Sequence, residues 1–201
     1  GVKYPRLTDN CALGDWQIDR NKLPNGIGWL VEQAHKHGIK FGIWIEPEMT
    51  NTTSELYEKH PEWVIKAPER EVVTGRGGTQ LVLDLGNPEV QDFVFSIVDD
   101  LLAENPEIDY IKWDFNRHIS EPGSPYLPAD RQDEAIYRFY LGVYDLFNWF
   151  KETYPDVMIE NCSGGGGRYD LAMMAVSTQI WTSDNTAARH RVHIQYGSLL
   201  A

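Results

Sequence analysis

The sequence has little cysteine, and it lacks the motifs of serine-nucleophile and metal chemistry. Cys11 and Cys162 are the only two cysteines among 201 residues, which is too few for a disulfide framework and fits a reducing compartment. No Gly-x-Ser-x-Gly segment is present, so serine hydrolase chemistry has no support. The six histidines are scattered without metal-ligand spacing, so we expect no metal site.

Positive charge and long apolar runs are also scarce. Lys and Arg total 18 against 30 Asp and Glu, for a net charge of −12, and no basic cluster offers a surface to nucleic acid. No apolar run reaches the ~18–20 residues that a membrane span needs. No signal-peptide pattern opens the chain, and it starts at Gly1, so we expect the true N-terminus to be missing.

Aromatic residues, by contrast, are plentiful: seven Trp, ten Tyr and seven Phe. They are first of all core residues, but some of them can stack on the apolar faces of sugar rings. An acidic chain is compatible with such a neutral ligand.

The order of the predicted elements is typical of an α/β protein. Apolar residues at helical spacing alternate with short runs of β-formers that read as buried strands. The spacing predicts helices over 26–37, 88–104, 130–153, 168–175 and 188–200, and strands over 39–46, 108–115, 157–162 and 177–183. We interpret 81–85 as a loop strand outside the main sheet. Four strands cannot close an eight-stranded barrel, so the chain is either an open sheet or a slice of a barrel.

Polar residues follow each of the four predicted strands. They are Glu46-Pro47-Glu48, Asp114 to Asn116, Cys162-Ser163 and Asp184-Asn185. In parallel α/β folds the active site lies at the carboxyl ends of the strands, so we expect these side chains to lie close together.

Asp114 ends an apolar strand together with two other polar residues. Under the period of two, Lys112, Asp114 and Asn116 point to the same side. Such a row is costly in a buried strand unless the groups serve each other or a ligand. We expect Lys112 to keep Asp114 ionised. The alternative is that Asp114 only turns the chain at the strand end.

Asp184 is a second carboxylate placed just beyond a strand. Trp181 could desolvate it, which would raise its pKa and suit a general acid. The alternative is an N-cap for the following helix. Two carboxylates on different strand ends are the catalytic groups that a glycosidase uses. Such an enzyme retains the anomeric configuration when the two carboxyl groups are ~5–5.5 Å apart and inverts it when they are ~6.5–9.5 Å apart.

Two further segments leave alternatives open. The run Gly164–Gly167 either lets a ligand approach the backbone closely or forms a tight loop, and it lacks the ending of a phosphate-binding loop. Glu46 and Glu48 could bind a metal, but we favour structural pairing with Lys or Arg.

Taken together and in order, several stretches resemble the glycoside hydrolase family 36 α-galactosidases, which share a clan with family 27. The resemblance covers essentially the whole chain. The stretches are Leu13-Gly14-Asp15-Trp16, Lys22 to Gly26, Trp44 to Met49, Gln80 to Asp84, Lys112 to Arg117, Asn161 to Arg168 and Trp181 to Thr186.

The resemblance implies an enzyme with a retaining mechanism and assigns roles to individual residues. Asp114 matches the family's nucleophile and Asp184 its acid/base. The positions that match galactose-binding residues are Trp44, Lys112, Asn116, Cys162 and Gly164, with Arg76 matching less closely because the spacing around it differs. No cofactor and no metal is implied.

The resemblance also implies a larger parent enzyme. We expect residues 1–201 to form strands three to six of a (β/α)8 TIM barrel, without the family's N-terminal β-sandwich and C-terminal domain. The Asp-Asp-Gly-Trp segment that grips galactose in the family is absent, and Ala187 stands where many relatives have an aspartate. We therefore expect the isolated chain to be inactive, and the parent to be a cytoplasmic homo-oligomer.

The substrate that the resemblance implies is a small α-galactoside such as melibiose or raffinose, hydrolysed by double displacement. Three alternatives remain open. They are an α-galactosyl transferase of the raffinose-synthase type, an α-N-acetylgalactosaminidase and a non-catalytic galactoside-binding remnant.

Overall fold

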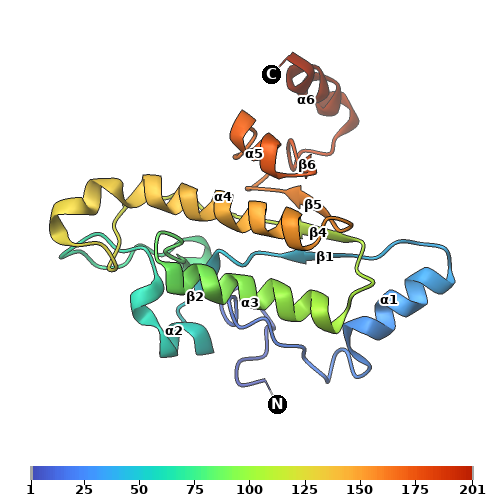
Figure 1. The fold of residues 1–201 in the computed structure, drawn as a ribbon, viewed down its shortest axis with the longest axis horizontal. Helices are drawn as coiled ribbons and strands as arrows, with labels where there is room; N and C mark the ends of the chain where they lie inside the picture. The colour runs from blue at the N-terminus through green and yellow to red at the C-terminus, as the bar shows by residue number, and fades with distance from the viewer. Residues whose placement is uncertain (1, 201) are drawn as a thin grey trace.

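A four-stranded parallel sheet with helices packed on one face forms the centre of the computed structural model, which describes residues 2–200 (Figure 1). The strands run in the order β1 (Gly42–Ile45), β4 (Tyr110–Trp113), β5 (Met158–Asn161) and β6 (Gln179–Ile180). The helices are α1 (Gly26–Lys36), α2 (Glu55–Lys59), α3 (Pro88–Glu104), α4 (Ala135–Thr153), α5 (Leu171–Val176) and α6 (Ala188–Leu200). The predicted α/β class is therefore confirmed, and each predicted strand is found, although all four are shorter than expected.

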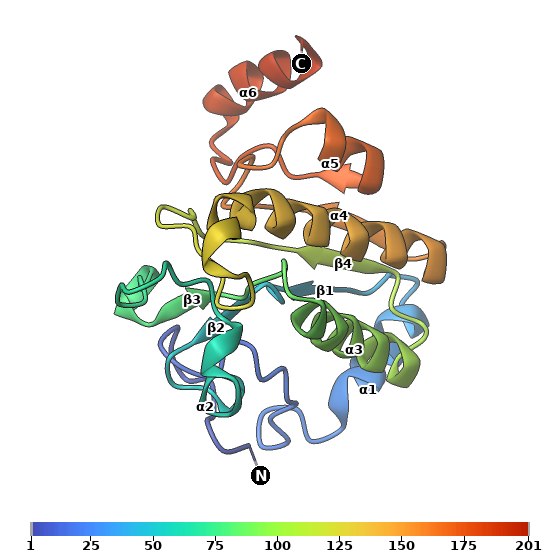
Figure 2. The same cartoon turned by 60° about the vertical axis from the view of Figure 1, so that its left-hand side comes forward.

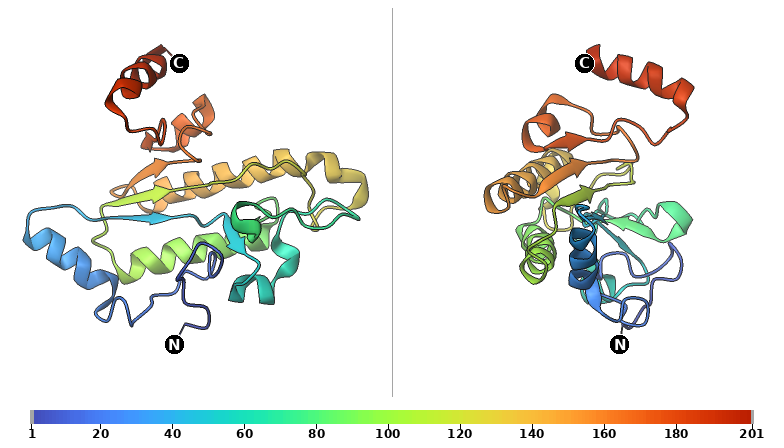
Figure 3. Two further views of the ribbon diagram at one scale, coloured as in Figure 1. Left: turned by 180° about the vertical axis from the view of Figure 1, so that it is seen from behind. Right: turned by 90° about the vertical axis from the view of Figure 1, so that its right-hand side faces the viewer.

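Helices α3 and α4 lie side by side against the sheet (Figure 2). Helix α3 begins where Asn87 Oδ1 accepts a hydrogen bond from Glu89 N at 3.0 Å, with Pro88 in the first turn. Its buried stripe is Val90, Val94, Val98 and Leu102, at the spacing of one helix face. Seen from behind, the sheet lies in front of these two helices (Figure 3).

Helix α4 contributes three of the buried aromatic side chains of the core. Its fully buried side chains include Phe139, Phe147 and Phe150, and Phe147 packs on Trp113 of β4 with ring centroids 5.0 Å apart. Gly142 lets α4 approach closely, because a Cβ there would lie 2.0 Å from the carbonyl oxygen of Leu85. The predicted helix over 130–153 is divided in the structure, since 129–134 form the 3-10 helix η3 (Ala129–Glu134) before α4.

A separate two-stranded antiparallel sheet pairs β2 (Met49–Asn51) with β3 (Gln80–Val82). The prediction that 81–85 lies outside the main sheet is therefore confirmed. Strand β2 and helix α2 were not predicted, because both are too short to show a period. Ser54 is the one local signal for α2, and its hydroxyl accepts a hydrogen bond from Tyr57 N at 3.0 Å. The remaining short helices are η1 (Pro61–Trp63) and η2 (Arg76–Gly78).

The register of the parallel sheet places Trp44, Lys112, Glu160 and Gln179 in one row across the four strands. Because Trp113 faces α4, its neighbour Lys112 faces the opposite side of the sheet, away from the helices. No helix among residues 2–200 is both long and apolar enough to cross a membrane.

Candidate active site

Asp114 lies at the carboxyl end of β4, surrounded by hydrogen-bond donors from β1, β4 and β5. Its side chain is buried, with 7% of its surface exposed. Oδ2 accepts from Trp44 Nε1 at 3.0 Å and from Asn116 Nδ2 at 2.7 Å, and Oδ1 accepts from the backbone N of Phe115 at 2.9 Å. The sheet order explains this arrangement, because β4 lies between the strands that carry Trp44 and Cys162.

Those donors determine the charge of Asp114. Burial raises its pKa, but the hydrogen bonds from Trp44, Asn116, the Cys162 thiol and Phe115 N outweigh burial, so the net pKa is lowered. The carboxylate is therefore ionised at neutral pH and ready to act as a base or a nucleophile. The contact with Phe115 N is the strand-end turn that we weighed as an alternative, and it coexists with the side-chain contacts.

Lys112 does not keep Asp114 ionised in the way we expected. Its ammonium pairs with Glu160 Oε1 of β5 at 2.9 Å and lies 4.1 Å from the ring centroid of Trp181. The expectation was wrong because a parallel neighbour in register is closer to Lys112 than a residue two positions along its own strand. About a quarter of the Lys112 side chain remains exposed (27%), so the ammonium is still accessible to a ligand.

Asp184 lies after β6, and its side chain is exposed. Trp181 Nε1 donates a hydrogen bond to Asp184 Oδ1 at 2.8 Å. The expectation that Trp181 desolvates this carboxylate is therefore wrong, and Trp181 instead holds its orientation. Asp184 is also not the cap of α6, because the helix begins at Ala188, four positions further on, and Ala187 O accepts from His190 N and Arg191 N.

The Cys162 thiol is a donor to Asp114 and not a reactive nucleophile. Burial, with the hydrogen bond to Asp114 as the next contribution, raises the pKa of Cys162 to about 12. The thiol therefore stays protonated at neutral pH, and it can donate its hydrogen to the carboxylate.

The glycine run forms a tight loop that packs against the backbone of the segment before Asp184. Ser163 N donates to Gly165 O at 3.0 Å, and Gly167 N donates to Ser163 O at 3.1 Å. A Cβ on Gly166 would lie 2.4 Å from Thr182 O, so only glycine allows this approach. Gly164 is exposed and has the positive φ of 52° that favours glycine, and a Cβ there would come within 3.6 Å of Asn116 Oδ1.

Glu48 and Arg168 connect the loop after β1 to the end of the glycine run. Arg168 makes two hydrogen bonds to the Glu48 carboxylate, one of them from Nη1 to Oε1 at 2.7 Å, and both side chains are buried. Trp113 Nε1 also donates to Glu48 Oε1 at 2.9 Å, and the Arg168 guanidinium lies 4.3 Å from the ring centroid of Phe115. Structural pairing was therefore the correct interpretation for Glu48.

Glu46 makes no such pair with any of residues 2–200, so the same interpretation was wrong for it. Its Oε1 accepts hydrogen bonds from the backbone N and the Nδ2 of Asn116, at 2.7 and 2.9 Å. Among residues 2–200 no group of three or more His, Cys, Asp or Glu side chains could hold a metal ion, and neither glutamate belongs to one.

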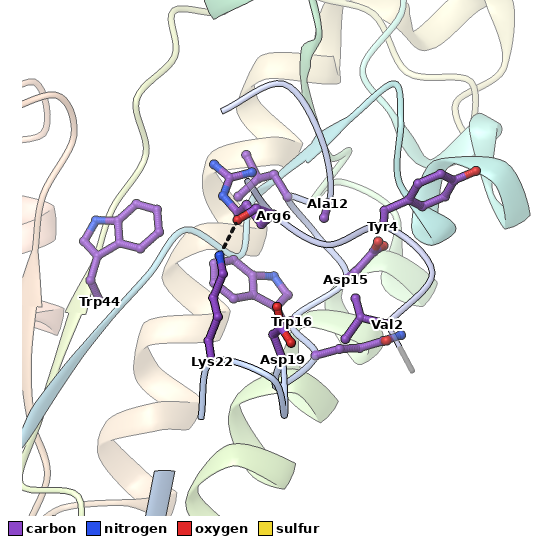
Figure 4. Close-up of a pocket in the computed structure, with 11 residues that line it drawn as sticks. Val2, Tyr4, Arg6, Ala12, Asp15, Trp16, Asp19, Lys22 and Trp44 are labelled. Atoms are coloured by element: carbon purple, nitrogen blue, oxygen red, sulfur yellow. Dashed lines mark hydrogen bonds between the residues drawn. The ribbon is translucent and has the colours of Figure 1, made fainter. Parts of the chain in front are cut away.

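Trp16 lies beside the site residue Trp44, and it was not predicted from the sequence as a site residue. It lines a cavity of about 150 Å³ together with Trp44, and their ring centroids are 6.2 Å apart (Figure 4). The only signal in the sequence is the Leu13-Gly14-Asp15-Trp16 stretch. Within this stretch Asp15 has a structural role, because its carboxylate accepts hydrogen bonds from the backbone N of Glu55 and Leu56.

Comparison with known proteins identifies the family. The melibiase family model matches residues 1–201. The chain belongs to the melibiase family. It is 47% identical to α-galactosidase 1 of Pediococcus pentosaceus and 46% identical to α-galactosidase AgaA of Geobacillus stearothermophilus, over 98% and 97% of its length. In each case it spans only 26% of the relative, about a quarter.

Solved structures of family 36 α-galactosidases have the same fold. A variant of AgaA in complex with raffinose superposes with a TM-score of 0.91 at 44% identity, covering 97% of this chain and 27% of that one. A second AgaA variant, in complex with stachyose, gives a TM-score of 0.89 at 44% identity, covering 96% and 26%.

Arg76 is a predicted site residue of this melibiase-family chain that the structure does not bring to Asp114. It lies in η2 with an exposed side chain and pairs with Asp9 at 3.3 Å. The loop that carries it contacts the site indirectly, because Arg117, next to Asn116, donates to Val73 O at 2.9 Å. A galactose-binding role for Arg76 stays a prediction.

The contact between Gly166 and Thr182 leads to a testable expectation. If the protein has the α-galactosidase activity proposed below, Gly166→Ala is expected to lower kcat on an aryl α-galactoside by about 10- to 100-fold, because the added methyl group displaces the segment before Asp184. Gly197→Ala is the matched control, since no atom lies within 4 Å of a Cβ at that position of α6. Steady-state kinetics of both variants in the full-length protein would measure the effect, and a wild-type kcat for Gly166→Ala would contradict it.

Proposed function

We propose that this chain is the catalytic core of a retaining α-galactosidase. It would release terminal α-linked galactose from small galactosides such as raffinose or melibiose. The observation that carries the proposal is Asp114, a buried carboxylate kept ionised by four donors at the end of a parallel strand. A second carboxylate, Asp184, follows the last strand of the same sheet.

In the proposed mechanism, Asp114 attacks the anomeric carbon while Asp184 protonates the leaving oxygen. The bond between the sugar and the leaving group breaks as an ester forms between the anomeric carbon and Asp114. Asp184, now ionised, takes a proton from water, which attacks the same carbon and releases galactose with its α configuration retained. The exposed position of Asp184 gives it access to both the leaving group and water.

Several neighbours would bind the sugar. Lys112 faces the open side of the sheet with an ammonium that only donates hydrogen bonds. Trp44 presents a partly exposed indole ring while its Nε1 holds Asp114. The thiol of Cys162 and the backbone of Gly164 border the same carboxylate and amide, and Arg76 would reach the sugar from η2, just before β3.

The relatives support this assignment of the two carboxylates. In the raffinose and stachyose complexes of AgaA, each variant carries a replacement at a different aspartate. Those two positions are separated along that chain by the same number of residues as Asp114 and Asp184 are here. The galactoside ligands support a substrate of the raffinose class.

The same comparison supports a proposal about architecture. We infer that residues 1–201 form strands three to six of a (β/α)8 barrel within a longer enzyme, with helices on the outer face. The parallel order of the strands and the packing of α3 and α4 on one face agree with such a slice. A homo-oligomeric parent and the domains on either side of the barrel belong to the same proposal.

Incubation of the full-length protein with raffinose tests the function. We expect free galactose and sucrose, with α-galactose as the first anomer seen by NMR. Products longer than raffinose, formed faster than galactose, would support galactosyl transfer instead. Faster turnover of an aryl α-N-acetylgalactosaminide than of the aryl α-galactoside would support an α-N-acetylgalactosaminidase instead. Galactose binding without turnover of any of these substrates would contradict the proposal and indicate a non-catalytic remnant.

A further inference from the structure

Glu46 and Asp114 share one amide group. Asn116 Nδ2 donates to Glu46 Oε1 at 2.9 Å and to Asp114 Oδ2 at 2.7 Å. An amide nitrogen carries two hydrogens, so both are used by the two carboxylates. Glu46 is almost completely buried, with 3% of its surface exposed, and it also accepts from Asn116 N at 2.7 Å.

This sharing determines which way the Asn116 amide points. A flipped amide would place Oδ1 against oxygens of both carboxylates, where an acceptor has no hydrogen to receive. In the observed orientation Oδ1 faces the glycine loop, 3.6 Å from the position a Cβ on Gly164 would take. No hydrogen bond within residues 2–200 ends on Asn116 Oδ1, so this oxygen is available as an acceptor.

From this arrangement we propose that Glu46 is a positioning residue of the galactoside site, a role that depends on the function proposed above. Glu46 fixes the Asn116 amide so that Nδ2 holds the nucleophile Asp114 and Oδ1 accepts a hydrogen bond from a sugar hydroxyl. The ligand chemistry that fits is therefore a hydroxyl donor beside the anomeric carbon. A ligand group that only accepts hydrogen bonds is disfavoured at that point.

The surroundings of Glu46 agree with a role directed at Asn116. Burial raises the pKa of Glu46, the Asn116 hydrogen bonds lower it, and nearby Asp114 and Glu48 raise it. The other glutamate of the segment, Glu48, is committed to Arg168 and Trp113. Glu46 has no Lys or Arg partner among the ion pairs of residues 2–200, so Asn116 is its principal contact.

A double-mutant cycle in the full-length protein tests the proposal. Glu46→Ala is expected to lower kcat/KM on an aryl α-galactoside by about 10- to 100-fold, because Asn116 is then free to rotate. Glu46→Gln keeps an oxygen acceptor at the same place and is expected to recover most of that loss. In a protein that already carries Asn116→Ala, adding Glu46→Ala is expected to lower kcat/KM by less than about 3-fold. Glu107→Ala, at an exposed position away from the site, is the control.

Two results would overturn the proposal. If Glu46→Ala lowers kcat/KM by the same factor with and without the Asn116 side chain, Glu46 acts only on the stability of the chain. If Glu46→Ala leaves both kcat/KM and KM at wild-type values, Asn116 is held by other contacts.

Calorimetric titration with galactose separates this proposal from the proposed function. The proteins titrated are the four of the cycle: wild type, Glu46→Ala, Asn116→Ala and the double variant. A wild type that binds galactose without turnover contradicts hydrolysis, and the cycle is then measured on Kd. Loss of galactose affinity in Glu46→Ala that vanishes without the Asn116 side chain would still support the positioning role. A wild type that neither binds galactose nor turns over an α-galactoside would overturn both.

Discussion

Asp114→Gly is expected to lower turnover of an aryl α-galactoside by about 10⁴-fold or more in the full-length protein. In the proposed mechanism the side chain removed is the one that forms the covalent bond, and the neighbouring carboxylate, Glu46, shares only the Asn116 side-chain donor with it. Glu46 is close but is turned toward Asn116, with both of its hydrogen bonds on that residue. The measurement is steady-state kinetics beside wild type, with circular dichroism to show that the variant is folded.

Added azide makes this test specific for the role of each carboxylate. In Asp114→Gly, azide can attack the anomeric carbon from the vacated side and is expected to restore turnover with a β-galactosyl azide product. In Asp184→Ala, the ester on Asp114 still forms with a good leaving group, so azide is expected to give the α-galactosyl azide. If Asp114→Gly keeps comparable activity without azide, the nucleophile is a different residue.

Arg168→Met is expected to destabilise the part of the protein around β4 and β5 by about 3–5 kcal/mol. The substitution leaves Glu48 as a buried carboxylate without its cation, although Trp113 Nε1 still donates to it. Methionine fills much of the space of the arginine stem and keeps a contact with Phe115. The loss therefore comes from the unpaired charge more than from a cavity.

Hydrogen exchange of the β4 and β5 amides across a urea series would measure this local stability without assuming that the whole protein unfolds in one step. The matched control is Glu48→Gln combined with Arg168→Met, which removes both charges and keeps an oxygen that accepts from Trp113. We expect the double variant to recover more than half of the loss. An Arg168→Met protein whose β4 and β5 amides are as protected as in wild type would show that the pair does not stabilise this part of the sheet.

Both predictions depend on contacts between segments that are far apart in the chain. Asp114 receives donors from Trp44 and Cys162, and Glu48 after β1 meets Arg168 at the end of the glycine run after β5. Each contact joins residues that lie at or after the carboxyl ends of different strands of the parallel sheet. This is why a change in one loop is expected to alter a carboxylate in another.

Local patterns were sufficient to predict most of the elements. The repeat of Val90, Val94 and Val98 indicates a helix, and Asn87 with Pro88 places its start, because these signals act within a few residues. The short apolar runs that end in polar residues predicted where each strand stops. The motifs around Asp114 and Asp184 were sufficient to indicate the family. Strand β2 and helix α2 were not predicted, because a strand of three residues and a helix of about one turn are too short to show a hydrophobic period.

The partners of the site residues were decided only by the tertiary structure. Lys112 pairs with Glu160 and not with Asp114 because the parallel register of β4 and β5 places residues 112 and 160 side by side, although they are far apart in the sequence. Trp181 donates to an exposed Asp184 where the sequence suggested burial. Glu46 turns toward Asn116 for the same reason, since strand order sets which polar side chains meet. Sequence spacing determines the face on which a side chain lies, whereas the packing of neighbouring strands determines what it contacts there.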